Sequence, residues 1–330
     1  MTRAQRNIPA AIALIFVAPL VAEFLLGDLS IRVLVALVPM APMYGGGALL
    51  IRELVRRTRR GWSAILLLGA AYSLIEEGFT TQSLFNPDYL HLHMHFLALA
   101  WIPFLHTGAW WTLFMLNLHT FWSISVSIAL VEALVPLQAD TPWLGPIGDA
   151  IVALLFLIGC VAGTRITLHQ DPFIAPAAQL IAAAVLSLLL IVLAFLTPRV
   201  APHSAPGVVP SPWITGAIAL VLGFSVLVIP PLWGWGAFSV MLAIDIAFLV
   251  MIYRLSRRAA WTPLHILSLA AGGAFAYGIH AFMARVVFGG TDLVARIGNG
   301  VFLAAAVTVV FFGVRNIHQA RTSQPQPASQ

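Results

Sequence analysis

The chain has 330 residues, of which 60% are hydrophobic and only 9% charged, and its mean hydropathy is +0.95. These values lie far outside the range of soluble domains and indicate a membrane protein. The 17 basic residues are all arginine, but they fall between apolar runs and form no basic patch with interleaved aromatic residues, so we expect no nucleic-acid partner. The single Cys160 excludes an internal disulfide framework, Cys-X-X-Cys redox chemistry and cysteine-based zinc sites.

Ten largely apolar runs are long enough to cross a bilayer, because about 20 helical residues span its hydrocarbon core. We interpret the first run as an uncleaved anchor, since it is too long for a signal peptide, carries Glu23 and leads into a second span without a small-residue cleavage site. The predicted fold is an all-α polytopic membrane protein with one transmembrane domain, residues 1–318. The predicted spans cover roughly 8–27, 32–52, 62–84, 110–135, 147–165, 175–197, 213–231, 235–253, 262–286 and 295–314.

The arginines predict the orientation of these spans, because cytoplasmic loops of membrane proteins are enriched in basic residues. With ten spans and a cytoplasmic N-terminus, 13 arginines fall on the cytoplasmic side and 4 on the outer side. We therefore expect both termini in the cytoplasm and place the chain in a cell membrane, the inner membrane of a bacterium. Its predicted partners are the lipid bilayer and a membrane peptide or small-molecule substrate.

Two segments are predicted to lie outside the spans. Residues 85–108, FNPDYLHLHMHFLALAWIPFLHTG, are external, amphipathic and interrupted by proline, which is typical of an interfacial helix or of a re-entrant cap over an outward-facing cavity. Residues 319–330 are a polar tail broken by prolines, for which we expect disorder in the cytoplasm.

The histidine tract within the external segment, HLHMH, invites a metal interpretation. His91, His93 and His95 share one face only in a strand, and in a helix only His91 and His95 are neighbours. No acidic or cysteine ligand lies alongside at a suitable spacing, and the tract matches none of the strong zinc signatures. The sequence therefore leaves any metal and any cofactor unassigned.

The third predicted span contains two adjacent glutamates, Glu76 and Glu77. At a rise of 1.5 Å per residue they lie about 21–22 Å along the span from Trp62, in the outer half of the bilayer. Ionisable groups at this depth are rare and usually face the interior of a helix bundle. The alternative is an aqueous outer vestibule, or a span that ends near Gly78 and leaves both carboxylates at the interface.

The fourth predicted span runs back inward and carries a second polar group. His119 and Ser123 are four residues apart, so they share one helix face. His119 lies about 13–14 Å in from the outer end, within roughly one turn of the depth of the glutamates. His280 falls toward the outer end of the ninth span. The candidate catalytic residues are therefore Glu76, Glu77, His119, Ser123 and His280, with helix-tying hydrogen bonds as the alternative role.

A glutamate pair on one span followed by a histidine on the next resembles the CPBP-type intramembrane proteases. That family includes the type II CAAX prenyl endopeptidases and bacterial abortive-infection proteins, and its motifs are EExxxR, FxxxH and HxxxN on successive helices. Glu76 and Glu77 match the acidic pair, whereas Thr81 stands at the arginine position. The resemblance implies a glutamate that activates water and histidine and asparagine groups that polarise the scissile carbonyl or stabilise its oxyanion.

The two histidine motifs of that family match in part. His119 fits the second motif with Met115 in place of phenylalanine, or the third with Ser123 in place of asparagine. His280 supplies the other histidine, with Ala284 at its asparagine position. The resemblance covers the second to fifth spans.

The residues also suit other functions. A carboxylate pair with a histidine partner serves general-base hydrolysis and proton-coupled transport equally well. An inverted repeat relating spans one to five to spans six to ten would favour transport, and it would pair LHTF around His119 with IHAF around His280. We place a membrane-embedded hydrolase first and a proton-coupled transporter second. A non-catalytic membrane scaffold is the third alternative.

Overall fold

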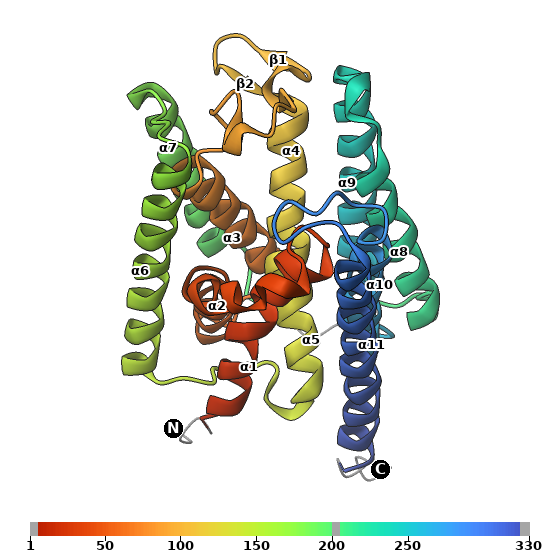
Figure 1. Cartoon of the computed structure of the whole chain (residues 1–330). Helices are drawn as coiled ribbons and strands as arrows, with labels where there is room; N and C mark the ends of the chain where they lie inside the picture. Colours follow the sequence, from red (N-terminus) through yellow and green to blue (C-terminus); the bar gives the residue numbers. More distant parts are fainter. Residues whose placement is uncertain (1–5, 200–204, 324–330) are drawn as a thin grey trace.

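The computed structural model describes residues 6–199 and 205–323, which form a helix bundle with a small cap at one end (Figure 1). The helices are α1 (Ile8–Pro19), α2 (Leu37–Arg57), α3 (Trp62–Ile75), α4 (Ala109–Asn117), α5 (Ser127–Leu134), α6 (Pro146–Gln170), α7 (Ala177–Leu196), α8 (Pro212–Val228), α9 (Trp235–Leu255), α10 (Pro263–His280) and α11 (Leu293–Thr322). Three π-helical segments continue α1, α3 and α4, namely η1 (Leu20–Leu25), η3 (Glu76–Thr80) and η6 (Leu118–Val126). The 3-10 turns are η2 (Ile31–Ala36), η4 (Tyr89–His91), η5 (Phe96–Ala98), η7 (Pro136–Gln138) and η8 (Pro231–Trp233).

Each of the ten predicted apolar runs coincides with a helix or with helical segments joined end to end. Among the described residues, seven of these are long and apolar enough to cross a membrane. The other three are Trp62–Thr80, which contains the glutamate pair, Pro212–Val228, which is shorter, and Pro263–His280, which contains two histidines. The structure therefore confirms an all-α membrane protein with several apolar helices.

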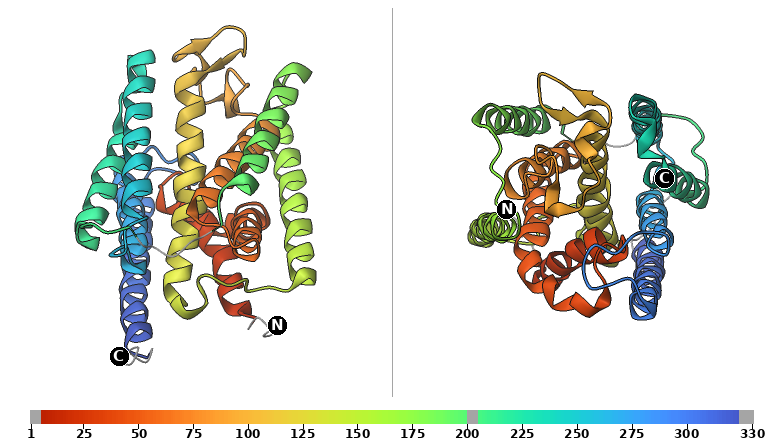
Figure 2. Two further views of the ribbon diagram at one scale, coloured as in Figure 1. Left: turned by 180° about the vertical axis from the view of Figure 1, so that it is seen from behind. Right: turned by 45° about the horizontal axis from the view of Figure 1, so that its top comes forward.

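The rod formed by α4, η6 and α5 runs through the middle of the bundle. In its most apolar 18-residue stretch, 78% is buried inside the bundle, against 11–17% in the corresponding stretches of α6, α7 and α9. Helices α1, α2 and α3 pack on one side of the rod with α6 against α2 and α7 against α3, while α8–α11 form the other side (Figure 1, Figure 2). The outer helices expose large apolar side chains such as Ile147, Leu188 and Phe311, as expected for surfaces that face lipid.

Helices α1 and α2 cross at a glycine. A Cβ atom built on Gly45 would lie 2.0 Å from the backbone oxygen of Ile15, so no larger residue fits without separating the two helices. Small residues permit this close approach of helix backbones in membrane proteins. The contact brings Tyr44, next to Gly45 on α2, within hydrogen-bond reach of Glu23 on η1.

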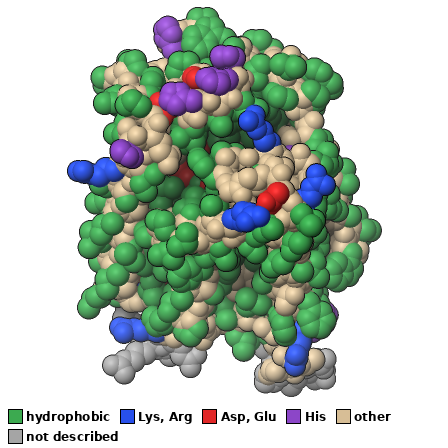
Figure 3. Space-filling model, in the orientation of Figure 1, with side chains coloured by type: hydrophobic (Ala, Val, Ile, Leu, Met, Phe, Trp, Pro, Cys, Tyr) green, Lys and Arg blue, Asp and Glu red, His purple; other side chains and the backbone are tan. Residues whose placement is uncertain are grey.

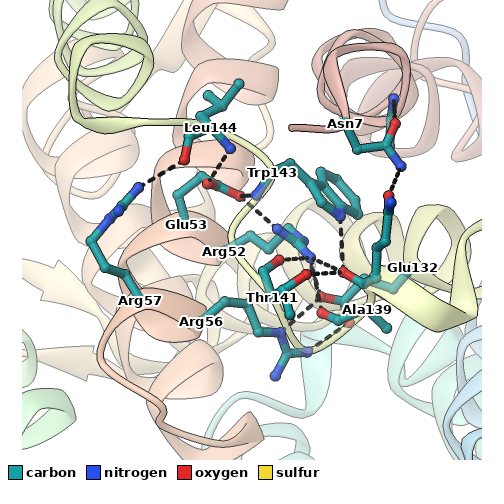
Figure 4. Close-up of polar contacts among 12 residues, drawn as sticks. Asn7, Arg52, Glu53, Arg56, Arg57, Glu132, Ala139, Thr141, Trp143 and Leu144 are labelled. Atoms are coloured by element: carbon teal, nitrogen blue, oxygen red, sulfur yellow. Dashed lines mark hydrogen bonds and ion pairs between the residues drawn. The ribbon is translucent and has the colours of Figure 1, made fainter. Parts of the chain in front are cut away.

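A buried ionic network joins α2 to α5 and to the loop between α5 and α6 (Figure 4). Glu132 lies 3.0 Å from Arg52 Nε and 2.6 Å from Arg56 Nη2. Glu53 accepts hydrogen bonds from the backbone N–H groups of Trp143 and Leu144. Each charge in this part of the bundle thus has a partner, as buried charges require. The network closes the end of the bundle opposite the cap.

The cap, residues 85–108, contains no α-helix, so the interfacial-helix alternative is wrong. It consists of 3-10 turns and a two-stranded hairpin, β1 (Trp101–Ile102) and β2 (Thr107–Gly108), at one end of α4 (Figure 1). Six of its residues have positive φ, a conformation that ends helices: Leu90, His91, His93, His95, Ala100 and His106. Asp171 in the α6–α7 turn accepts hydrogen bonds from Asn86 and from the backbone of Leu90, which ties the cap to the bundle.

The structure describes only the first residues of the predicted disordered tail, 319–330. Helix α11 continues to Thr322, so residues 319–322 are helical and not disordered. Residues 324–330 lie outside the described part of the chain.

Candidate functional site

The three π-helical segments carry the polar residues that converge inside the bundle. Glu23 lies on η1, Glu76 begins η3, and His119 and Ser123 lie on η6. In η3 the backbone N–H of Thr81 donates to the carbonyl of Glu76, five residues earlier, at 2.9 Å. Such π-helical turns are rare and frequently mark functional sites. The pattern of apolar residues at the α-helical repeat does not reveal such π-helical turns.

His119 lies between the two glutamates of α3 and η3. Its Nε2 atom is 2.7 Å from Oε1 of Glu77, and its Nδ1 atom is 3.1 Å from Oε2 of Glu76. The three residues are only 2–6% exposed. The structure thus brings together the carboxylate pair and the histidine that the sequence placed at one depth. We call these three residues the Glu–His cluster.

The two nitrogens of His119 have different contacts. A neutral imidazole carries one N–H group, yet both nitrogens of His119 face carboxylate oxygens. Nε2 makes a hydrogen bond with Glu77, whereas Nδ1 lies 3.2 Å from the Ser123 hydroxyl and within ion-pair distance of Glu76. His119 is therefore placed where a proton can pass between the imidazole and a buried carboxylate.

The two glutamates have different surroundings. Glu77 Oε2 accepts hydrogen bonds from the hydroxyls of Thr81, at 2.9 Å, and of Ser83. Glu76 Oε2 accepts no hydrogen bond of ordinary geometry from the residues that the structure describes, and its close contact is His119 Nδ1. Glu77 is therefore held in place, whereas Glu76 has acceptor capacity to spare.

Two tyrosines complete the pocket around the imidazole. The rings of Tyr44 and Tyr72 lie 6.1 and 6.0 Å from the His119 ring, measured between centroids. The Tyr44 hydroxyl donates to Glu23 at 2.5 Å. The Tyr72 hydroxyl is buried and interacts electrostatically with Glu76. It has no partner of hydrogen-bond geometry among the described residues. Tyr44 was not among the predicted site residues, and only its place beside Glu23 reveals it.

The surface of the molecule is hollowed near the cap. Figure 3 shows a hollow below the histidine-bearing cap, with an acidic side chain at its floor. Glu23 is partly exposed, unlike the buried glutamate pair. In the cap, burial raises the pKa of Tyr89 well above its usual value, and the carboxylates of Glu77, Glu23 and Glu76 add to this effect. Tyr89 therefore lies within electrostatic range of all three carboxylates.

The Glu–His cluster also has the residue types of a metal site, since one ligand atom from each of the three residues lies within 4.8 Å of the others. A single ion, however, binds one nitrogen of a histidine, and here Glu76 and Glu77 lie next to different nitrogens of His119. A cation would fit only after the imidazole turned one nitrogen toward both carboxylates. The arrangement favours proton sharing over metal binding.

Of the other two predicted site residues, one contacts the Glu–His cluster and one does not. Ser123 is 1% exposed and its hydroxyl lies 3.2 Å from His119 Nδ1, so it contacts the histidine from within the same helix turn. His280 ends α10 near the backbone of Leu26, and no hydrogen bond or ion pair joins it to the cluster within the described residues. Ser123 belongs to the support of His119, and the structure does not bring His280 into the site.

The histidine tract of the cap does have an acidic neighbour. Asp88 Oδ2 lies 2.9 Å from His93 Nδ1 and 3.6 Å from His91 Nδ1. The expectation that no acidic ligand lies alongside is therefore wrong, because the turns of the cap fold Asp88 back over the tract. Those pairs are exposed and consist of one carboxylate and two imidazoles.

A family model described as an uncharacterized membrane protein family matches residues 12–322, nearly the full length. The chain belongs to this family. No curated protein and no solved structure gives a significant match.

This family assignment corrects the resemblance to the CPBP-type proteases, because the matching model is not that of the CPBP or CAAX protease family. The misleading signal was a glutamate pair followed by a histidine on the next span. Ionisable residues within membrane spans usually face the bundle interior whatever the protein does, so this pattern is not specific to one family. Thr81 and Ala284, at the family's arginine and asparagine positions, already departed from its motifs.

Proposed function

We propose that this chain is a membrane-embedded hydrolase in which the Glu–His cluster activates a water molecule. One observation carries the proposal: a single buried imidazole contacts both carboxylates through its two nitrogens. Nucleophilic water needs a base beside it and a place to send the proton, and this cluster supplies both. The substrate class is a carbonyl compound presented in the bilayer, such as a membrane peptide.

The surroundings of each group assign its role. Glu76, with acceptor capacity to spare, takes the proton from water as the water oxygen attacks the carbonyl carbon. His119 passes a proton to the leaving group. Glu77, held by Thr81 and Ser83, orients the imidazole. The Tyr72 hydroxyl is the available donor for the oxygen that becomes negative.

The packing beneath the cluster favours hydrolysis over transport. Leu49, Ile124 and Ile128 are fully buried between the cluster and the inner end of the bundle. Below them lies the ionic network of Arg52 and Glu132. This apolar packing and the paired charges beside it support a reaction site over a path for protons through the bundle.

Purified protein in liposomes separates the two functions. We expect cleavage of a library of membrane peptides by the wild-type chain, no pH-driven proton flux, and loss of cleavage in Glu76→Gln, which removes the base at constant volume. Glutamate-dependent flux without cleavage would transfer the site to the transporter alternative. Neither activity, together with reduced thermal stability of Glu76→Gln, would make the cluster a helix tie.

The orientation of the bundle is a second expectation. Helix α1 begins and α11 ends at the same end of the molecule, away from the cap (Figure 1). Together with the arginine bias of 13 to 4, this supports cytoplasmic termini and an external cap. Reporter fusions after Arg60 and near His93 should report opposite sides of a bacterial inner membrane. Two reporters on one side would refute this topology.

A further inference from the structure

A hollow lined almost entirely by arginines lies at the other end of the bundle from the cap. Its volume is about 490 Å³, and its lining residues come from the α2–α3 turn and from the chain just after α7: Arg57, Thr58, Arg59, Arg60 and Arg199. A backbone bridge between Arg60 and Arg199 holds the two segments together. The hydrolase proposal does not use this site.

The four arginines of the hollow differ in how many hydrogen bonds and ion pairs their guanidinium groups make. Arg57 pairs with Asp149 at 2.5 Å, and Arg60 donates to the carbonyl of Thr197. Arg59 and Arg199 are exposed and make no side-chain hydrogen bond or ion pair to residues in the described ranges. The Nε atom of Arg60 is enclosed and lacks an acceptor among the same residues. The hollow therefore carries unneutralised positive charge and free N–H donors.

This donor set is matched by a phosphate group. Guanidinium forks bind phosphate oxygens through paired hydrogen bonds, and several around one hollow exceed what a single carboxylate can satisfy. The hollow is also bordered by the end of α7, a candidate span, and by the turn that starts α3. Its position is therefore the membrane boundary, where phospholipid headgroups lie.

Arginine enrichment at helix ends also orients membrane proteins, and this alone accounts for basic residues in the α2–α3 turn. It does not account for their convergence with Arg199 from a distant part of the sequence on one hollow. The backbone of Arg59 moreover adopts the left-handed conformation, with φ 56°, which is uncommon for residues other than glycine.

We propose that this hollow binds the phosphate of an anionic lipid headgroup and so clamps the end of α7 to the start of α3. A soluble phosphate ester offers the same chemistry, and the two sources are separable by experiment. Because α3 leads to Glu76 and Glu77, the bound headgroup would stabilise the helix that carries the glutamates.

Native mass spectrometry of the full chain in a neutral detergent tests the proposal. Phosphatidylglycerol is titrated against the wild type, the double variant Arg59→Gln/Arg199→Gln and the control Arg254→Gln, which removes an exposed arginine of α9 outside the hollow. We expect the double variant to bind about tenfold more weakly or worse, since each basic residue near a phosphate contributes to lipid affinity. The control should bind like the wild type.

Glycerol phosphate and inorganic phosphate are then added as competitors. Lipid that stays bound identifies the headgroup in its membrane as the ligand, whereas displacement at equal concentration assigns the site to soluble phosphate esters. Unchanged lipid binding in the double variant, or an equal loss in Arg254→Gln, would overturn the proposal. If the double variant aggregates, the single variants Arg59→Gln and Arg199→Gln, both at exposed positions, replace it.

Discussion

Replacing Glu132 by glutamine is expected to destabilise the folded chain by about 3–5 kcal/mol, because it removes the close carboxylate of buried Arg56 and one of the two carboxylates of buried Arg52. Arg52 and Arg56 lie 3.0 and 2.6 Å from Glu132, and the three side chains are at most 7% exposed. Glu53 already pairs with Arg52 at 2.5 Å and accepts hydrogen bonds from the backbone of the α5–α6 loop, so it cannot fully replace Glu132. Denaturant unfolding of the purified protein in a mild detergent measures the change.

Asp292→Asn is the matched control for this prediction. Asp292 pairs with Arg32 at 2.6 Å, but the two side chains are 46% and 49% exposed. Hydrogen bonds from the backbone N–H of Ala295 and from Arg32 hold the pKa of Asp292 below its usual value. Its contribution is thus complete at neutral pH and is lost as the pH falls through that lowered pKa.

The control should lose far less stability than Glu132→Gln at neutral pH, because exposed ion pairs are weak and asparagine caps α11 as well as aspartate does. Equal losses in Glu132→Gln and Asp292→Asn would show that burial of the network contributes nothing.

Within the Glu–His cluster, Glu76→Gln and His119→Gln are each expected to reduce the rate of hydrolysis by about 10²–10⁴-fold, the usual contribution of general acid–base groups. Glu77→Gln should cost less, because a glutamine oxygen still accepts a hydrogen bond from His119 while its hydroxyl partners remain. The double variant Glu76→Gln/His119→Gln should be no slower than either single variant, since residues that act as a unit are not additive.

Single-turnover cleavage of one identified substrate gives these rates. Asp245→Asn is the control, because Asp245 is also a buried carboxyl inside the bundle but contacts Asn117 and not the cluster. It should retain wild-type activity. Multiplying losses in the double variant, or an equal loss in Asp245→Asn, would contradict a concerted Glu76–His119 pair.

The positions of the helices could be predicted from the sequence alone. A span needs a run of apolar residues set by the thickness of the bilayer, and that requirement is local in the chain. Each predicted run therefore coincides with helical structure, for example Trp235–Leu255 for residues 235–253. The depth of Glu76 and His119 followed from the same counting, because a helix rises by a constant distance per residue.

The conformation of the cap could not be predicted from its own sequence. Its composition suited an amphipathic helix, yet Asp171 from the α6–α7 turn anchors Asn86 and the backbone of Leu90. A segment held by a distant turn adopts the conformation that satisfies those hydrogen bonds, whatever its own periodicity. The resemblance to the CPBP-type proteases was misleading for a similar reason. A motif of a few polar residues on two spans does not specify how the rest of the chain packs.

The sequence by itself determined the helical spans, the membrane setting and the two helices that carry the glutamates and His119. Only the tertiary structure decided that both nitrogens of His119 face carboxylates, that Tyr44 joins the site, and that Glu132 binds the arginines of α2. The reason is that helix rotation and the π-helical turns set the direction of each side chain. Both depend on contacts between distant residues, such as Gly45 against Ile15, which no local pattern encodes.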